Sequence, residues 1–488
     1  MKINLLDFIK LTHKWLGLVV GWFLFFIFLS GSISIFDREI DLWMQPKLYA
    51  FLPPKFVTLQ AFKQSYQQWT LIRNYPRNII ILPYDRNPII RVMHYQDKIL
   101  QGNAIDPIKG TLIKLRQTGG GYFIDTLHKN FFLGPALGKP IMLCVDIIFI
   151  LILVTGLLVY LFLFSKTFLF INRNRKKPVF QRDLHTVLSI FTYPFSIIIS
   201  LSALLFFIPV FFSHKPIFNH NPYPHTTISN PVTPLDLKKM SDKASIYFSR
   251  SPELIKITQK TIIFYARGKN SLSHSMNFIA FDKYNQNKIS VRPGSNFIHR
   301  IDQQLKGVHL LHCENNLLRI VAFPLGMGCT ILTAMGLLFF SNKQKERLGA
   351  ETKNKLFLPY RIMDGITLGI IMGSLHAFII YFWMNRILSD HLGNRLDLEI
   401  ESFFTVLLVI LCIGIGSAFG NYIHLAWRKL MFSFSCLCLT LPLFEIAINL
   451  NTAEIAFTNG YYSYFAINSF IFIIGCIFLQ LHRILSKE

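Results

Sequence analysis

The chain has 488 residues, of which 52% are hydrophobic and only 16% are charged. A chain of this length is too long for one compact soluble core, and its long apolar runs are typical of an integral membrane protein. Its 50 lysines and arginines exceed its 26 carboxylates, giving a formal net charge of +24. We attribute this charge to loops that flank membrane spans, and we therefore exclude a role in binding nucleic acid.

Eight apolar runs of about 20 residues are long enough to cross a hydrocarbon core of about 30 Å as helices. They cover residues 15–36, 140–164, 187–212, 317–340, 362–385, 402–425, 429–449 and 462–482. The first run is longer than the core of a signal peptide and no small-residue cleavage site follows it, so we expect it to be retained. The predicted fold class is an α-helical integral membrane protein with about eight transmembrane helices.

Lysine and arginine are dense in two short segments, 165–183 and 341–361. By the positive-inside rule these loops are cytoplasmic, and both termini lie on the same side. The long segments between the first four spans then face the other side. The predicted order is TM1 (1–36), an external segment (37–127), TM2, a basic loop and TM3 (128–212), a second external segment (213–308), TM4 (309–340), a cytoplasmic loop (341–361) and TM5–TM8 (362–488).

Each external segment has the pattern of a small α+β module, with one helix followed by short β-rich runs between turn residues. We expect helices at 58–70 and 235–248, and strands at 79–82, 89–93, 103–112, 254–257, 261–265 and 278–282. After the first module, Gly119-Gly120-Gly121 lacks the Gly-Lys-Ser/Thr of a phosphate-binding loop. We expect this stretch to be a flexible hinge.

A histidine stands at the start of each of the first four spans, and its spacing to a small pair repeats. His13 is followed by Ser30-Gly31 at +17 and +18, and His185, 172 residues later, by Ser202-Ala203 at the same distances. His128 is followed by Thr155-Gly156 at +27 and +28, and His309 by Met335-Gly336 at +26 and +27. A lone histidine at a membrane interface is ordinary, but four in two matched pairs indicate a duplicated unit with a function.

The topology sorts these histidines by depth. Because the first and third spans begin at the cytoplasmic side, His13 and His185 share one depth, and His128 and His309 share the other. The small pairs lie well along each span, where they permit the close approach of a flat macrocycle or of another helix. The sequence leaves both interpretations open.

The order of several short motifs resembles the PepSY-associated transmembrane helix family, often described as iron-regulated membrane proteins. The motifs are Thr12-His13-Lys14-Trp15-Leu16-Gly17, Ser30-Gly31, the acidic and aromatic exit that ends at Pro46, Asp106-Pro107-x-x-Gly110, Leu127-His128, Thr155-Gly156 and Leu184-His185. Asn385-Arg386-Ile387-Leu388 and Glu401-Ser402-Phe403-Phe404 resemble a longer branch of this family. The resemblance covers roughly residues 1–425.

The longer branch includes ferrisiderophore reductases of the bacterial inner membrane, and the resemblance implies PepSY-like periplasmic modules and b-type haem on histidines of the first four spans. We expect two bis-histidine haem b groups, on His13 and His185 at the cytoplasmic side and on His128 and His309 at the periplasmic side. A single haem with another pairing stays open. This chain lacks the glycines that often follow the fourth histidine in the family, so His312 is an alternative to His309.

Haem iron with both axial positions filled suits electron transfer rather than oxygen chemistry. The predicted function is reduction of a ferric siderophore or another ferric chelate at the periplasmic face, which weakens the hold of hard oxygen ligands and frees ferrous iron. No G-x-G-x-x-G follows a strand, so the electron donor is a quinol or a cytoplasmic flavoprotein. The alternative is a cofactor-free siderophore permease or a PepSY-based regulatory or binding protein.

Other polar residues receive simpler interpretations. Asp146 and Glu445 lie within spans. Either could relay protons or pair with a buried base, and a structural hydrogen bond is the interpretation that we favour. His376 is an alternative ligand without a counterpart in the repeat. The remaining cluster, His214, His220 and His225, is expected in a solvated loop rather than at a weak metal site. The seven cysteines form no C-x-x-C, which argues against a disulfide framework and a zinc site.

Overall fold

The computed structural model describes residues 4–75, 78–96, 99–162, 177–212, 232–267, 273, 276–283, 287–291, 297–311, 316–348 and 357–486. Eight helices in these residues are long and apolar enough to cross a membrane. They are α1 (Leu5–Ser34), α5 (Pro135–Phe162), α6 (Lys177–Phe212), α9 (Asn316–Leu348), α10 (Phe357–Ile387), α11 (Arg395–Phe419), α12 (Ile423–Ile448) and α14 (Tyr462–Ser486). The eight predicted spans are confirmed. Most of these helices are longer than the apolar runs and continue into polar residues at their ends, because a helical backbone satisfies its own hydrogen bonds.

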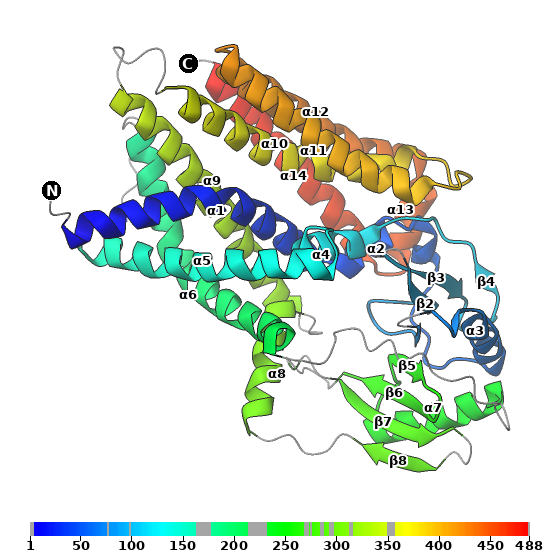
Figure 1. The fold of residues 1–488 in the computed structure, drawn as a ribbon. Helices are drawn as coiled ribbons and strands as arrows, with labels where there is room; N and C mark the ends of the chain where they lie inside the picture. Colours follow the sequence, from blue (N-terminus) through cyan, green and yellow to red (C-terminus); the bar gives the residue numbers. More distant parts are fainter. Residues whose placement is uncertain are drawn as a thin grey trace.

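The spanning helices form two groups (Figure 1). In the first, α1 and α6 each pack against both α5 and α9, and in the second α10 packs against α11 and α12, and α12 against α14. Helix α10 also contacts α1 and α9, so it joins the two groups. Both termini lie at the end of the helices opposite the β-sheet (Figure 1), as an even number of spans requires.

Short helices lie between the spans and the sheet along the chain. They are α2 (Asp37–Trp43), the 3-10 helix η1 (Pro46–Ala50), α4 (Gly120–Asn130) and α8 (Phe297–Leu310). A further short helix, α13 (Leu450–Thr458), joins α12 to α14. Contrary to the sequence interpretation, none of the four histidines heads a spanning helix. His128 and His309 lie near the ends of α4 and α8, before left-handed residues that include Phe131 and Leu311, whereas His13 and His185 lie about two turns inside α1 and α6.

This correction has a physical reason. An apolar run measures only the part of a helix that faces hydrocarbon, and it does not detect helical turns in polar flanks. Aromatic residues such as Phe131 and Phe132, with φ values of 54° and 60°, interrupt the backbone without interrupting hydrophobicity.

The two predicted external modules share one sheet. Its strands are β1 (Ile79–Ile81), β2 (Ile90–Gln96), β3 (Ile99–Ile105), β4 (Leu112–Ile113), β5 (Leu254–Ile257), β6 (Thr261–Ala266), β7 (Asn277–Asp282) and β8 (Lys288–Val291), in the antiparallel order β4-β3-β2-β1-β5-β6-β7-β8. The halves join where Ile80 pairs with Ile255 and Ile81 with Leu254. Helices α3 (Leu59–Ile72) and α7 (Pro234–Phe248), close to the predicted bounds, pack against each other and against strands of the two halves.

The glycine stretch at the start of α4 is a packing site, and the predicted hinge is wrong. The Gly121 amide donates a 2.8 Å hydrogen bond to Oδ1 of Asp41, and a Cβ on Gly121 would collide with the Asp37 carbonyl of α2. Gly120 has φ of +54°, a conformation that glycine adopts without strain. Glycine therefore lets α4, and with it His128, lie directly against α2.

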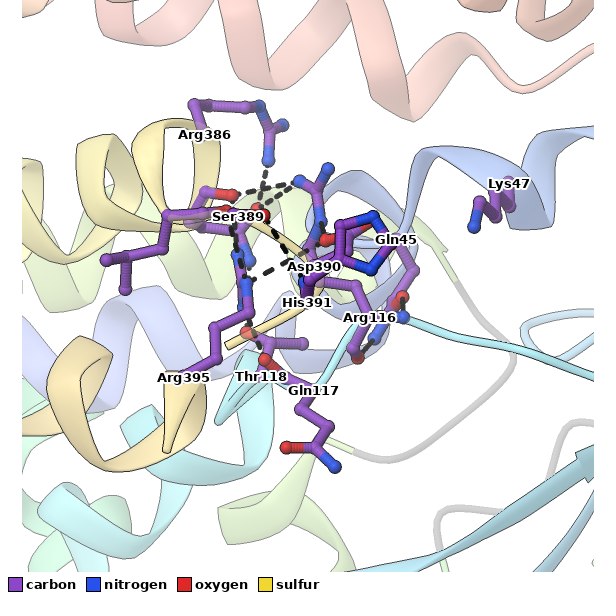
Figure 2. Close-up of polar contacts among 12 residues, drawn as sticks. Gln45, Lys47, Arg116, Gln117, Thr118, Arg386, Ser389, Asp390, His391 and Arg395 are labelled. Atoms are coloured by element: carbon purple, nitrogen blue, oxygen red, sulfur yellow. Dashed lines mark hydrogen bonds and ion pairs between the residues drawn. The ribbon is translucent and has the colours of Figure 1, made fainter. Parts of the chain in front are cut away.

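A buried polar network joins the α10–α11 turn to residues 116–119 (Figure 2). Asn385 donates a 2.8 Å hydrogen bond to Oε1 of Glu399, whose Oε2 accepts from Thr118 Oγ1 at 2.6 Å and from the Gly119 amide at 2.9 Å. Arg116 donates to Asp390 at 2.8 Å and to the Asn385 carbonyl at 2.9 Å. The network fixes the second helix group to the segment that leads into α4.

The Asn385-Arg386 motif also explains Glu445, which pairs with a buried base, one of the alternatives left open by the sequence. Arg386 and Glu445 are fully buried and form an ion pair. Arg386 also donates a 2.8 Å hydrogen bond to the Trp43 carbonyl and lies 3.9 Å from the centroid of the Trp43 ring. Asp146 has the expected hydrogen bond, accepting from Ser200 Oγ at 2.5 Å.

We expect Arg386→Met to lower the free energy of unfolding by about 3–5 kcal/mol, because it leaves the Glu445 carboxylate buried without a partner. The measurement is thermal or denaturant unfolding of the protein in detergent. The double variant Arg386→Met/Glu445→Leu should recover most of the loss, and Lys429→Met, at an exposed position, should change little. Equal destabilisation by the single and double variants would contradict the ion-pair explanation.

Candidate functional site: two facing pairs of histidines

The structure brings the four predicted histidines together as two facing pairs. The ring centroids of His13 and His185 are 6.5 Å apart with an interplanar angle of 67°. Those of His128 and His309 are 6.3 Å apart with an angle of 26°. Each pair takes one ring from each half of the duplicated unit, α1 with α6 and α4 with α8.

Each imidazole is anchored through Nδ1 to a backbone carbonyl of a neighbouring span. The distances are 3.2 Å from His13 to Ile152, 3.1 Å from His128 to Ile27, 3.0 Å from His185 to Leu332 and 3.0 Å from His309 to Ile199. A carbonyl oxygen only accepts hydrogen bonds, so Nδ1 carries the proton in all four rings. The lone pair of each neutral ring is therefore on Nε2, the nitrogen that remains able to bind a metal.

The small residues of the repeat explain why these carbonyls are accessible. Gly31, Gly156, Ala203 and Gly336 each lie four residues after the carbonyl that accepts the histidine hydrogen bond. A helical side chain covers the turn on the N-terminal side of its own Cα, so a missing side chain exposes the carbonyl of that turn.

Three of these small residues are glycines in close contact with a histidine ring, and we call each of them a glycine seat. A Cβ on Gly31 would lie 2.7 Å from Cε1 of His128, and a Cβ on Gly156 or Gly336 would lie 3.0 Å from Cε1 of His13 or His185. Small residues in this repeat thus make room for the imidazole rings. The sequence analysis expected them to permit the close approach of a macrocycle or of another helix, and it did not anticipate this role. The acceptor carbonyls were missed as well, although the offset of four residues before each small residue is a signal that could have found them.

Two hydroxyl groups add to the anchoring. Thr155 Oγ1 lies 3.2 Å from Nδ1 of His13, and Ser202 Oγ lies 3.0 Å from Nδ1 of His309. Each hydroxyl comes from the residue just before the small residue that seats the ring. A second contact on Nδ1 restricts ring rotation and so fixes the direction of Nε2.

The outer pair lies outside the membrane-spanning segments, and its rings are neutral at physiological pH. Burial lowers the pKa of His128 and of His309 to about 4, more than the hydrogen bonds to Ile27 and Ile199 raise it. The nearby charge of Lys129 lowers both values further. Because metal ions bind neutral imidazole, this pair is poised for ligation without first losing a proton.

Among the other histidines considered from the sequence, the described His376 does not join these pairs. His376 uses both ring nitrogens, with Nδ1 2.7 Å from the Met372 carbonyl and Nε2 2.7 Å from Ser433 Oγ, which leaves none for a metal. Four further candidates lie outside the described residues, namely His312, His214, His220 and His225. His309 is thus the described histidine that faces His128.

Among the residues that the structure describes, neither pair has a third protein donor of the usual kinds. Across the part of the chain that the structure describes, no group of three or more His, Cys, Asp or Glu side chains could hold a metal ion. A metal bound between either pair would therefore take two ligands from the described protein and would need the others from elsewhere.

Comparison with known proteins places the chain in a family. The family model described as the PepSY-associated TM region matches residues 11–343, which include all four histidines and the whole sheet. The match covers about two thirds of the chain. A search of curated proteins gave no match. The chain belongs to the PepSY-associated TM region family, and it is a multi-pass membrane protein with eight candidate spans.

Proposed function

We propose that this protein is a b-type haem protein of the bacterial inner membrane that passes electrons to a ferric siderophore or another ferric chelate at the periplasmic face. The proposal depends on one observation: at each of two levels, two imidazoles anchored through Nδ1 face each other across the helix group. The sheet would lie in the periplasm and both termini in the cytoplasm.

The spacing of the rings fits axial ligation. Two metal–nitrogen bonds of about 2 Å place the centroids of two opposed imidazoles about 6 Å apart, close to the observed 6.5 and 6.3 Å. Since the described residues offer no third donor, a group that supplies its own equatorial ligands, such as haem, suits the pairs. The chain has no C-x-x-C for covalent attachment, which favours b-type haem.

His13 and His185 would hold the inner haem, and His128 and His309 the outer one. When bound, haem would supply one-electron transfer, with two histidines as its protein ligands. The carbonyl anchors fix each ring and make Nε2 a better donor. Along α1, His13 and Ile27, the anchor of His128, are 14 residues apart, or about 21 Å of helix, so the two levels together cover much of a hydrocarbon core of about 30 Å.

The connection between the sheet and the outer pair suggests where the acceptor binds. Helices α4 and α8 carry His128 and His309 at the end of the helix group nearest the sheet (Figure 1). Transfer of one electron from a quinol or a cytoplasmic flavoprotein reduces Fe(III) to Fe(II). Hard oxygen ligands hold Fe(II) less strongly, so the chelate releases its metal.

The test is the spectrum and redox behaviour of the purified protein. We expect a pyridine haemochrome of b type with two haem groups per chain, reduced by dithionite and reoxidised when ferric chelate is added without oxygen. A colourless protein would overturn the proposal and favour a cofactor-free permease or a PepSY-based binding protein. A coloured protein that no ferric chelate reoxidises would overturn the assigned acceptor.

A further inference from the structure

A small polar pocket lies between α2 and the β1–β2 part of the sheet. Three arginines line it, Arg38, Arg86 and Arg91, together with Asp41, Tyr84 and Asn87. The space inside it that a water-sized group can occupy is about 10 Å³, which is close to the least that holds one water molecule. The pocket therefore suits an oxygen of one charged group on a larger ligand.

Two of the three guanidinium groups donate few hydrogen bonds to the described residues. Arg86 is fully engaged, donating to Glu39 at 2.7 and 3.0 Å. Arg91 makes one side-chain hydrogen bond among the described residues, from Nε to Asn87 Oδ1 at 3.0 Å, and has no ion pair there. Arg38 lies 3.5 Å from an oxygen of Asp37 and 3.8 Å from one of Asp41, and its guanidinium donates no hydrogen bond to a described residue.

The pocket lining is positively charged. Asp41 is its single carboxylate, and burial raises the pKa of Asp41, which makes the negative form less favourable. Burial lowers the pKa of Arg91 more than the Asp41 carboxylate raises it. Arg38 differs, because Tyr84 and nearby carboxylates that include Asp37 raise its pKa. An anion bound beside Arg91 would relieve the cost of burying that charge.

The surroundings are basic as well. Segments 37–134 and 213–311, which carry the sheet, contain 27 lysines and arginines and 12 carboxylates, a net charge of +15. The positive charge of the chain is therefore not confined to the short loops that the sequence interpretation emphasised. A basic surface of this kind attracts negatively charged ligands.

The pocket is close to the outer pair of histidines. Helix α2, which carries Arg38, packs against α4, which carries His128. Asp125, three residues before His128, interacts electrostatically with Arg38. Glu39, which accepts hydrogen bonds from Arg86 in the pocket, also accepts a 2.8 Å hydrogen bond from Arg319 of α9.

We propose that Arg38 and Arg91 bind a carboxylate group of a negatively charged ferric chelate, and that this pocket thereby selects anionic chelates as acceptors. This inference rests on the proposed function. The planar guanidinium fork matches a carboxylate through two parallel hydrogen bonds, which gives orientation as well as affinity. A chelate held here by one arm would be presented beside the outer pair.

The experiment measures binding of the redox-inert Ga(III)–citrate complex to the full chain in detergent by titration calorimetry. We expect Arg91→Gln and Arg38→Gln each to weaken binding about tenfold or more, because each removes a charge-assisted contact. The matched control is Arg73→Gln, at an exposed position on the end of α3, which should bind as the parent protein does. The cationic Ga(III) complex of desferrioxamine B should bind more weakly than the citrate complex to the parent protein.

Unchanged Ga(III)–citrate affinity in both pocket variants, with their unfolding temperatures preserved, would overturn the inference, as would equal affinity for the cationic complex. Repeating the titration in nanodiscs separates the chelate from lipid phosphate. If phosphatidylglycerol abolishes citrate binding relative to phosphatidylcholine in the parent protein, the pocket holds a headgroup and the chelate assignment fails. Because gallium binding needs no haem, a colourless protein that binds Ga(III)–citrate refutes the proposed function alone, and a b-type protein that does not bind it refutes this inference alone.

Discussion

Replacing His128 with alanine should reduce the haem content from two groups per chain to about one. The outer pair then has one imidazole, whereas His13 and His185 remain anchored to α5 and α9. His309→Ala should have the same effect, and so should the double variant, because both residues serve one site. By contrast, His13→Ala/His128→Ala should remove all haem, since it breaks both pairs. The measurement is the pyridine haemochrome content per chain.

The matched control for these variants is His376→Ala. This histidine lies within a span, as His13 and His185 do, but Met372 and Ser433 occupy both of its nitrogens. We expect His376→Ala to keep two haem groups, and His312→Ala to do so as well. Full haem content in all four single variants of the paired histidines would contradict the ligand assignment. Loss in His312→Ala with retention in His309→Ala would move the fourth ligand to His312.

Closing a glycine seat should remove a haem group without changing any ligand. In Gly31→Val the new side chain begins 2.7 Å from the His128 ring, and the ring must leave the Ile27 carbonyl. We therefore expect Gly31→Val to lose the outer haem as His128→Ala does, and Gly156→Val to lose the inner one. Visible spectroscopy and haem content of the purified variants provide the measurement.

The control for the seats is Gly17→Val, on the same helix. A Cβ at Gly17 meets no atom within 4 Å, so this variant tests the cost of valine in α1 without touching an imidazole. It should retain two haem groups. If Gly31→Val also retains two, with an unchanged spectrum, then the glycine does not position His128.

The spans and the depth of the histidines were predictable, because both follow from local composition. Hydrophobic length identifies a spanning helix whatever its neighbours are. Once the order of the spans is known, His13 and His185 must lie near one face and His128 and His309 near the other. The Asp106 turn was predictable for the same reason, and Asp106 Oδ1 accepts from the Ile108 and Lys109 amides at 2.8 and 2.9 Å.

The amino-acid sequence by itself determined eight spans, their order and the four histidines, since hydropathy and residue spacing are properties of the chain alone. Only the tertiary structure decided that His128 is seated on Gly31 and His13 on Gly156, because such contacts join residues more than 95 positions apart. The joining of β1 with β5 was decided in the same way, since backbone hydrogen bonds between edge strands carry no side-chain signature. The Arg386–Glu445 pair likewise depends on how α10 and α12 pack.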